Sequence, residues 1–376
     1  MGRDTVSENS NVSSNSISSN SIYWVHLLRV MAVMFVVLLH ASAQILQLDV
    51  EFASFDWWVG NIIDSSMRMC VPLLFMITGY LLLGKSESLG TFFHKRFRRI
   101  AIPLLAWTAI YVVWILLVES KDPTPISPFS AEISTAILSF FPVSLLGLLF
   151  APAYYHLWFM YVLIGMYLCL PLLRSLVKNA DKTLLWYFIG LWSVATFVFS
   201  GIKAAGLYNL IDLSMVSGSV GFLVLGYLLG GWAINRRLYL SMWLVYIVSV
   251  AITAIGTWGM SSDDTLNQTF YGNVPSLLSM VVSVFIIVRY LAETSRFLQS
   301  AWIKALVLSL SSCTFGIYLV HALFFYIFHK GLLGFNLDSL QGNPLIFIPL
   351  TAIVVYICSF LVVSFIKKLP YVRIIV

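Results

Sequence analysis

Charged residues are scarce in this chain. Of 376 residues, 10% are Asp, Glu, Lys or Arg and 60% are hydrophobic, and the mean hydropathy is +0.92. Soluble domains contain about 25% charged residues, so the shortage argues against a soluble Rossmann or barrel enzyme. The apolar composition also excludes an intrinsically disordered chain, a collagen and a small disulfide scaffold. We therefore predict a polytopic membrane protein.

Cysteine is scarce as well, and its placement suggests no chemistry. The four cysteines lie singly in long apolar stretches without CxxC spacing, which favours a packing role over redox or metal use. The six histidines are also scattered, and no HExxH motif occurs. We expect no metal site.

The chain has no apolar signal-peptide core near its start. Residues 1–21 are polar and rich in Ser and Asn, a composition typical of a flexible segment with nothing to bury. A secretory signal would need an apolar region and a small-residue cleavage site. We interpret residues 1–21 as a flexible cytoplasmic tail and expect the first membrane span to direct insertion.

Apolar stretches long enough to cross a bilayer are abundant. A helix that crosses ~30 Å of hydrocarbon needs about 20 mostly apolar residues. Ten stretches meet this requirement and define a transmembrane domain over residues 22–366, followed by a short basic cytoplasmic tail over 367–376. The predicted spans are 24–46, 58–83, 100–118, 154–173, 184–200, 218–234, 239–259, 275–291, 305–328 and 344–366. The predicted fold class is all-α, with about ten transmembrane helices.

The basic residues indicate how these spans are oriented. Cytoplasmic loops retain Lys and Arg, and with the N-terminus inside, 17 of the 22 Lys and Arg fall on the inner side. Lys121, Lys203 and Lys330 fall outside, and Arg29 and Arg68 lie within spans. We predict that both termini are cytoplasmic. The net charge of +6 follows from this topology and does not indicate a nucleic-acid partner.

The longest outer connection, residues 119–153, contains a further apolar stretch at 133–150. Its eighteen residues are interrupted by Pro142, and counting them as a span would reverse the side of every later loop. We interpret this stretch as a re-entrant or interfacial segment.

The first span carries two ionisable residues, Arg29 and His40. Eleven residues correspond to about three helical turns, so both side chains share one face, ~16.5 Å apart along the axis. Charges within a bilayer are costly and often functional. For Arg29, extension to the inner interface is a structural alternative that we favour. For His40, which lies deeper, we favour a functional role over a purely structural hydrogen bond.

The second span carries Asp64 and Arg68, which are neighbours on a helix because of their i,i+4 spacing. An ion pair that keeps both charges in the membrane and a role in a site are equally compatible with this spacing. Asp64 lies near the level of His40, where a carboxylate can orient an imidazole.

Two further histidines fall in the outer half of the membrane. His156 begins the fourth span among aromatic residues, where a histidine is commonly part of the interfacial belt. His321 lies in the ninth span, and Tyr318, three residues earlier, shares its face. The candidate catalytic residues are Arg29, His40, Asp64, Arg68, His156, Tyr318 and His321.

The inner loop between spans two and three is strongly basic, with Lys95, Arg96, Arg98 and Arg99 close together. Contact with anionic lipid is one explanation. A site for a phosphorylated cytoplasmic ligand is another, because arginine forks match phosphate oxygens. A protein that holds a phosphate-bearing donor inside and acts near the outer face would have this polarised arrangement.

Five motifs together resemble the acyltransferase 3 family. In order, they are Arg29 and His40 with ten residues between them, FMITGYLL at 75–82, KRFRRIAIP at 95–103, HLWF at 156–159 and YLVH at 318–321. The resemblance covers roughly residues 22–366, and five motifs in order at matching depths are specific. Within the family, the segment HLWFMY looks most like the enterobacterial common antigen type of O-acetyltransferase.

The resemblance implies a multi-pass enzyme of the bacterial inner membrane, embedded in membrane lipid. Such an enzyme moves an acyl group, usually acetyl, from cytoplasmic acetyl-CoA to a hydroxyl of a surface polysaccharide or its undecaprenyl-linked precursor. Acetyl-CoA would be a co-substrate, and no metal is implied.

The resemblance also assigns roles to residues. His40 is the essential histidine, and Arg29 is its motif partner. The residues implied to face the CoA phosphates are Arg29, Lys95, Arg96, Arg98 and Arg99. A sugar hydroxyl needs a base near neutrality to attack a thioester, and imidazole fits; whether His40 deprotonates the hydroxyl or first takes the acyl group stays open. Either Arg68, or Tyr318 with His321, would stabilise the oxyanion.

Two other functions are compatible with ten spans and buried charges. A transporter or export protein for a glycan intermediate is the main alternative, although no inverted repeat is visible. A membrane sensor or scaffold, with buried polar groups that serve packing alone, is the third.

Overall fold

The computed structural model describes residues 20–47, 50–119, 152–204, 213–263, 265–272 and 274–376. These ranges are helical, and their only β contact is an isolated bridge between Ser262 and Thr265. The all-α prediction is confirmed. Most of the expected tail at 1–21 and the whole of the stretch at 133–150 lie outside the described residues.

Within the described ranges, nine helical segments are long and apolar enough to cross a membrane. Several consist of two or three consecutive elements. They are α1 (Asn20–Gln47), α2 (Phe55–Met67) with α3 (Cys70–Leu82), α4 (Leu89–Leu117), the 3-10 turn η2 (Tyr155–Leu157) with α7 (Trp158–Asn179), α8 (Lys182–Ser193) with a π-helical turn (Val194–Val198) and α9 (Phe199–Ala204), α11 (Arg236–Met260), η5 (Thr269–Tyr271) with α12 (Pro275–Thr294), α13 (Ala301–His329) and α14 (Pro344–Ile366).

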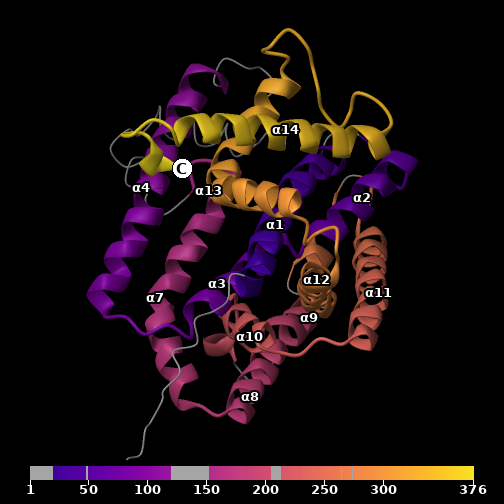
Figure 1. Ribbon diagram of the computed structural model, residues 1–376. Helices are drawn as coiled ribbons and strands as arrows, with labels where there is room; N and C mark the ends of the chain where they lie inside the picture. Colours follow the sequence, from indigo (N-terminus) through magenta and orange to yellow (C-terminus); the bar gives the residue numbers. More distant parts are fainter. Residues whose placement is uncertain (1–19, 48–49, 120–151, 205–212, 264, 273) are drawn as a thin grey trace, which may run out of the picture.

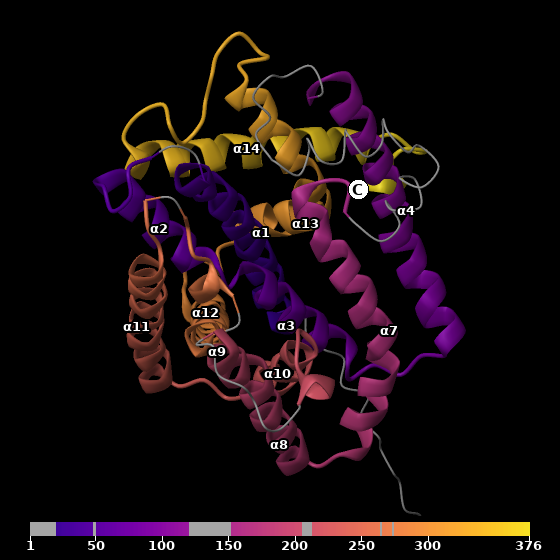
Figure 2. The ribbon, with the colours of Figure 1, turned by 180° about the vertical axis from the view of Figure 1, so that it is seen from behind.

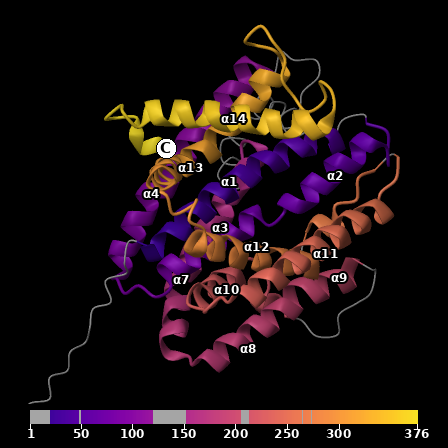
Figure 3. The ribbon, with the colours of Figure 1, turned by 45° about the vertical axis from the view of Figure 1, so that its right-hand side comes forward.

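The helix α1 is the centre of the bundle. It packs against α2, α3, α12, α13 and α14, and its buried face contributes many residues to the main apolar core. The helices α4 and α7 lie side by side on one flank, and α8 lies at the bottom of Figures 1 and 2, from where the chain rises through α9 toward α12. Figure 3 shows α9, α11 and α12 running alongside one another on the opposite flank.

The two ends of the bundle differ in chemistry. The loop from α3 to α4 and the end of α7 lie at one end, which we call the basic end because Lys95 and its neighbours are there. The opposite end, where α1 ends and α7 begins, is called the histidine end.

The second predicted span is interrupted at Arg68 and Met69, between α2 and α3. Pro72 explains the break, because it has no N–H for the carbonyl of residue 68 and its ring crowds that carbonyl. Proline is tolerated there because it falls in the first turn of α3. The interruption places Arg68 at a kink, beside the cavity described below.

The predicted span 218–234 is much shorter than expected. It forms α10 (Val220–Gly230), an apolar helix of 11 residues, which is ~16 Å long and about half the bilayer thickness. Gly218 at φ +86° precedes the helix, and Gly230 and Gly231 end it. The prediction that this segment forms a full-length span is wrong.

The helix α10 is nevertheless fixed firmly, because it crosses α3 at backbone contact. A Cβ atom on Gly226 would lie 2.1 Å from the Met76 carbonyl oxygen, and one on Gly79 would lie 1.9 Å from that of Leu223. Small residues allow membrane helices to approach this closely. The contact sets the position of Phe222, which lines the cavity.

The basic segment at 95–99 is not a loop. The helix α4 begins at Leu89, eleven residues before the predicted span, and Ser88 caps it by accepting a hydrogen bond from the Thr91 amide at 3.4 Å. The prediction of an inner loop is therefore corrected: the four cations lie on the first turns of α4.

Candidate active site

A cavity of about 730 Å³ lies within the bundle, toward the histidine end. Its walls come from α1, the α2–α3 kink, η2 with α7, α10, η5 with α12, and α13. The polar and aromatic lining residues include His40, Gln44, Arg68, Tyr155, His156, Tyr271 and Tyr318. Four of the candidate residues predicted from sequence therefore face one space.

Three histidines from distant parts of the chain meet beside this cavity, and His40 and His156 line it. The ring of His321 stacks on that of His40, with centroids 5.3 Å apart, and lies 5.0 Å from that of His156. His40 comes from α1, His156 from η2 and His321 from α13. His156 and His321 are fully buried, whereas His40 is partly exposed to the cavity. We call these three residues the histidine cluster.

Hydrogen bonding defines one tautomer in this cluster. The Nδ1 atom of His321 lies 2.6 Å from the Tyr318 carbonyl oxygen, and a carbonyl only accepts, so Nδ1 carries the proton. In the neutral ring, Nε2 then keeps a lone pair. Among the described residues, neither this atom nor either ring nitrogen of His156 has a hydrogen-bond partner. These three nitrogens are buried, and of the two residues only His156 lines the cavity.

Tyrosines surround the histidine cluster. The Tyr318 hydroxyl donates to the His156 carbonyl oxygen, and the Tyr111 hydroxyl donates to the Leu319 carbonyl oxygen at 2.8 Å. Tyr155 packs against His40 with ring centroids 5.0 Å apart. Because the Tyr318 hydroxyl is bound to the backbone, it holds η2 against α13.

Asp64 and Arg68 form the ion pair that their spacing allows. The Arg68 Nε atom donates to Asp64 Oδ1 at 2.5 Å, and Nη2 contacts the same oxygen. Asp64 is fully buried, whereas 21% of the Arg68 side chain is exposed, at the cavity wall. Among the described residues, the rings packed against His40 belong to Tyr155 and His321, whereas the Asp64 carboxylate contacts Arg68. The Asp64 carboxylate therefore orients the Arg68 guanidinium.

Tyr271 is a cavity residue that sequence reasoning missed. Its ring lies under the Arg68 guanidinium, with Cζ 3.9 Å from the ring centroid. It belongs to the connection between α11 and α12, where no sequence pattern marks a site. Tyr155 was also missed, although it directly precedes His156 in the sequence.

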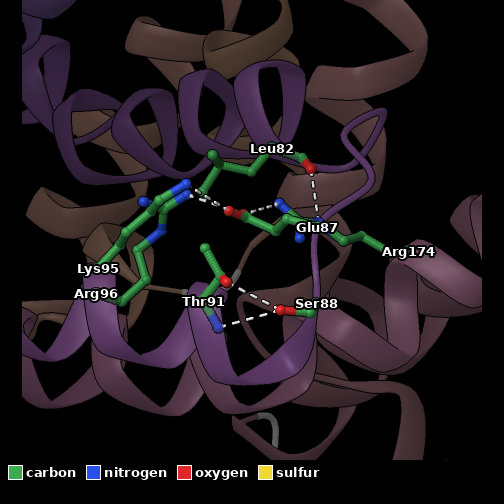
Figure 4. A network of polar contacts seen from close by, with 7 residues as sticks. All are labelled: Leu82, Glu87, Ser88, Thr91, Lys95, Arg96 and Arg174. Carbon is green, nitrogen blue, oxygen red and sulfur yellow. Dashed lines mark hydrogen bonds and ion pairs between the residues drawn. The ribbon is translucent and has the colours of Figure 1, made fainter.

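The basic end contains a second polar network, centred on Glu87 (Figure 4). Its carboxylate accepts hydrogen bonds from Arg174 at 3.0 Å and from Lys95 at 3.2 Å, and Arg96 lies 3.6 Å away. Burial raises the pKa of Glu87, but the hydrogen bonds from Arg174 and Lys95 outweigh burial, so the pKa lies below its ordinary value. The network ties the start of α4 to the end of α7.

The remaining cations of the basic end are less constrained. Arg98 and Arg99 are exposed, and no described residue forms an ion pair with them or with Arg29. Arg29 lies close enough to Arg99 for their charges to repel, and the Arg96 Cζ atom lies 5.8 Å from the Tyr167 ring centroid on α7. The structure thus groups Arg29 with the basic cluster rather than with His40.

The described residues define a polytopic membrane protein with a histidine-containing cavity. Among them, no three His, Cys, Asp or Glu side chains are grouped to hold a metal ion. The family model for the acyltransferase domain matches residues 22–365, nearly the whole chain. The chain therefore belongs to the acyltransferase 3 family and is a membrane acyltransferase. No curated protein and no solved structure matches it.

Proposed function

We propose that the protein is an O-acetyltransferase of the bacterial inner membrane. It takes the acetyl group from cytoplasmic acetyl-CoA and transfers it to a hydroxyl of a surface polysaccharide or its lipid-linked precursor. The family supports acyl transfer, and the five motifs quoted above support the donor and the acceptor class. In this topology the basic end faces the cytoplasm, as the positive-inside rule predicts.

The cavity provides the groups that this reaction needs. His40 accepts the proton of the sugar hydroxyl, whose oxygen attacks the thioester carbonyl carbon. Arg68, held by Asp64 at the same cavity, stabilises the negative charge on the carbonyl oxygen. The C–S bond then breaks, and the CoA thiolate leaves and takes up the proton that His40 accepted, which restores the neutral imidazole.

The basic end provides charges for the donor phosphates. Lys95 and Arg96 already share Glu87 with Arg174, so we assign the main contacts to Arg29, Arg98 and Arg99. Arginine guanidinium groups suit phosphate because they donate paired hydrogen bonds.

The single observation that carries this proposal is the position of His40. Its ring stacks on His321 and faces a cavity that also contains a fixed guanidinium. The cavity thus combines a base with a cation that can stabilise an oxyanion, two groups that acyl transfer uses.

Substitution of His40 by Ala tests the proposal in cells. The variant should be inserted at the normal level but should leave surface glycan without its acetyl groups. A His329→Gln variant is a suitable control, because His329 lies on α13 outside the cavity lining. Normal acetylation with His40→Ala would overturn the proposal, and glycan movement that survives removal of acyl-CoA would favour a transporter.

A further inference from the structure

We propose that Tyr271 is a positioning residue for Arg68, and that Asp64 and Tyr271 form a slot for a guanidinium ion. This inference rests on the proposed function, in which Arg68 stabilises the oxyanion. It assigns a role to the connection between α11 and α12, which the sequence marks only as a loop.

The slot holds the guanidinium from two sides. The Asp64 carboxylate engages Nε and Nη2 at its edge, and the Tyr271 ring covers one face at 3.9 Å. These contacts leave Nη1 for a carbonyl oxygen in the cavity. A planar cation that stacks on an aromatic face while its edge binds a carboxylate is held in one orientation.

A buried hydrogen-bond chain fixes Tyr271 in turn. Its hydroxyl donates to Asn61 Oδ1 at 2.7 Å, and Asn61 Nδ2 donates to the Ala254 carbonyl oxygen at 2.9 Å. Ser65 also donates to Asn61 Oδ1, at 3.2 Å. Asn61 is fully buried and Tyr271 is 5% exposed. The chain thus joins α2, the η5 connection and α11 around Arg68.

Stacking on Tyr271 restricts the conformational freedom that the Arg68 side chain would otherwise keep. Arg68 lies at the Pro72 kink, and its ion pair with Asp64 comes from its own helical segment. A long arginine side chain held at one edge keeps several rotamers. Tyr271 removes this freedom from outside the helix, so the guanidinium faces the cavity before the reaction begins.

The first test separates ring stacking from hydrogen bonding in acetyl-transfer assays with labelled acetyl-CoA. Tyr271→Phe keeps the ring but loses the hydrogen bond to Asn61, and it should retain more activity than the variants that lack the ring. Tyr271→Leu and Tyr271→Met lose the ring and should lower kcat about tenfold with little change in the KM for acetyl-CoA. Tyr246→Leu is a matched control, because Tyr246 donates to the Ser66 carbonyl oxygen of α2 at 3.1 Å but does not line the cavity.

The second test uses free guanidinium ion as a probe. Arg68→Ala should lose transfer activity and regain part of it when guanidinium chloride is added at a non-denaturing concentration, whereas ammonium chloride should have no effect. The double variant Arg68→Ala with Tyr271→Leu should not be rescued. Both variants are compared only after gel filtration in detergent shows that they elute like the unmodified protein.

The outcomes distinguish the slot from the proposed function. Absence of rescue in Arg68→Ala, equal rescue in the double variant, or an unchanged kcat in Tyr271→Leu and Tyr271→Met would overturn the slot. If the unmodified protein itself transfers no acetyl group to glycan, the proposed function fails instead.

Discussion

The rings of His40 and His321 stack with their centroids 5.3 Å apart, although they belong to α1 and α13. His321 is also fixed through Nδ1 by the Tyr318 carbonyl oxygen. The hydrogen bond orients the His321 ring without using a carboxylate. Because the His321 ring is fixed in this way, its stacking holds the His40 ring beside the cavity.

The stacking predicts that His321→Asn will impair catalysis without unfolding the protein. Proton transfer by a positioned side chain contributes about 100-fold or more. Because His321 only positions the base His40, we expect part of this contribution to be lost, with kcat lowered about tenfold and little change in the KM for acetyl-CoA. Labelled transfer at varied acetyl-CoA concentrations measures both constants. Tyr318→Phe keeps the carbonyl that binds His321 and should be far milder; a similar loss in both variants would contradict this account.

Substitution of Arg99 by Ala should weaken donor binding. A hydrogen bond to a charged group contributes about 1.5–3 kcal/mol, so the KM for acetyl-CoA should rise at least tenfold while kcat changes little. Lys178→Ala is the control, because Lys178 is exposed at the end of α7, also at the basic end. Equal effects of the two substitutions would indicate a diffuse charge effect rather than a phosphate site.

We predict that the ion pairs of Glu87 stabilise the folded protein in a pH-dependent way. Its pKa is lowered from an ordinary value of 4.5, so its ion pairs stabilise the folded protein above that value and are lost as the pH falls through the lower, folded-state pKa. Thermal unfolding in detergent should show Glu87→Gln less stable at neutral pH, with the difference shrinking below about pH 4.5. Glu293→Gln, which removes an exposed pair with Arg289, should change little at any pH. A difference for Glu87→Gln that does not vary with pH would rule out this linkage.

Gly226→Ala should destabilise the crossing of α3 and α10. The added Cβ would meet the Met76 carbonyl oxygen at 2.1 Å, and overpacking of this kind costs about 1–3 kcal/mol. Chemical denaturation in detergent, read by tryptophan fluorescence, measures the change. Gly165→Ala adds the same methyl group where nothing lies within 4 Å and should be neutral or stabilising. Equal effects of the two substitutions on stability would mean that the contact between α3 and α10 does not stabilise the protein.

Much of the fold was predictable from the sequence, because a helix that crosses a bilayer needs a long, mostly apolar stretch. Each of nine predicted spans corresponds to a long apolar helix. The exceptions have local causes that hydropathy does not report. The kink at Arg68 comes from Pro72, the short α10 ends at two glycines, and the early start of α4 comes from the Ser88 cap.

The candidate site was predictable only where one helix decides the geometry. The pairing of Asp64 with Arg68 follows from i,i+4 spacing, and their depth in a span made them candidates. Tyr271 and Glu87 belong to connections, and their partners come from other helices. Only tertiary packing brings these residues together, so a single sequence does not indicate them.

The most direct test of the central claim uses inside-out membrane vesicles that contain the acceptor glycan. They are given acetyl-CoA labelled in its acetyl group, and the unmodified protein is compared with His40→Ala, with insertion and folding verified for both. We predict that, in vesicles not permeabilised with detergent, label enters lipid-linked or polymeric glycan only with the unmodified protein. Equal labelling by both proteins, or no labelling by either, would contradict the claim that His40 transfers acetyl groups from a cytoplasmic donor to glycan.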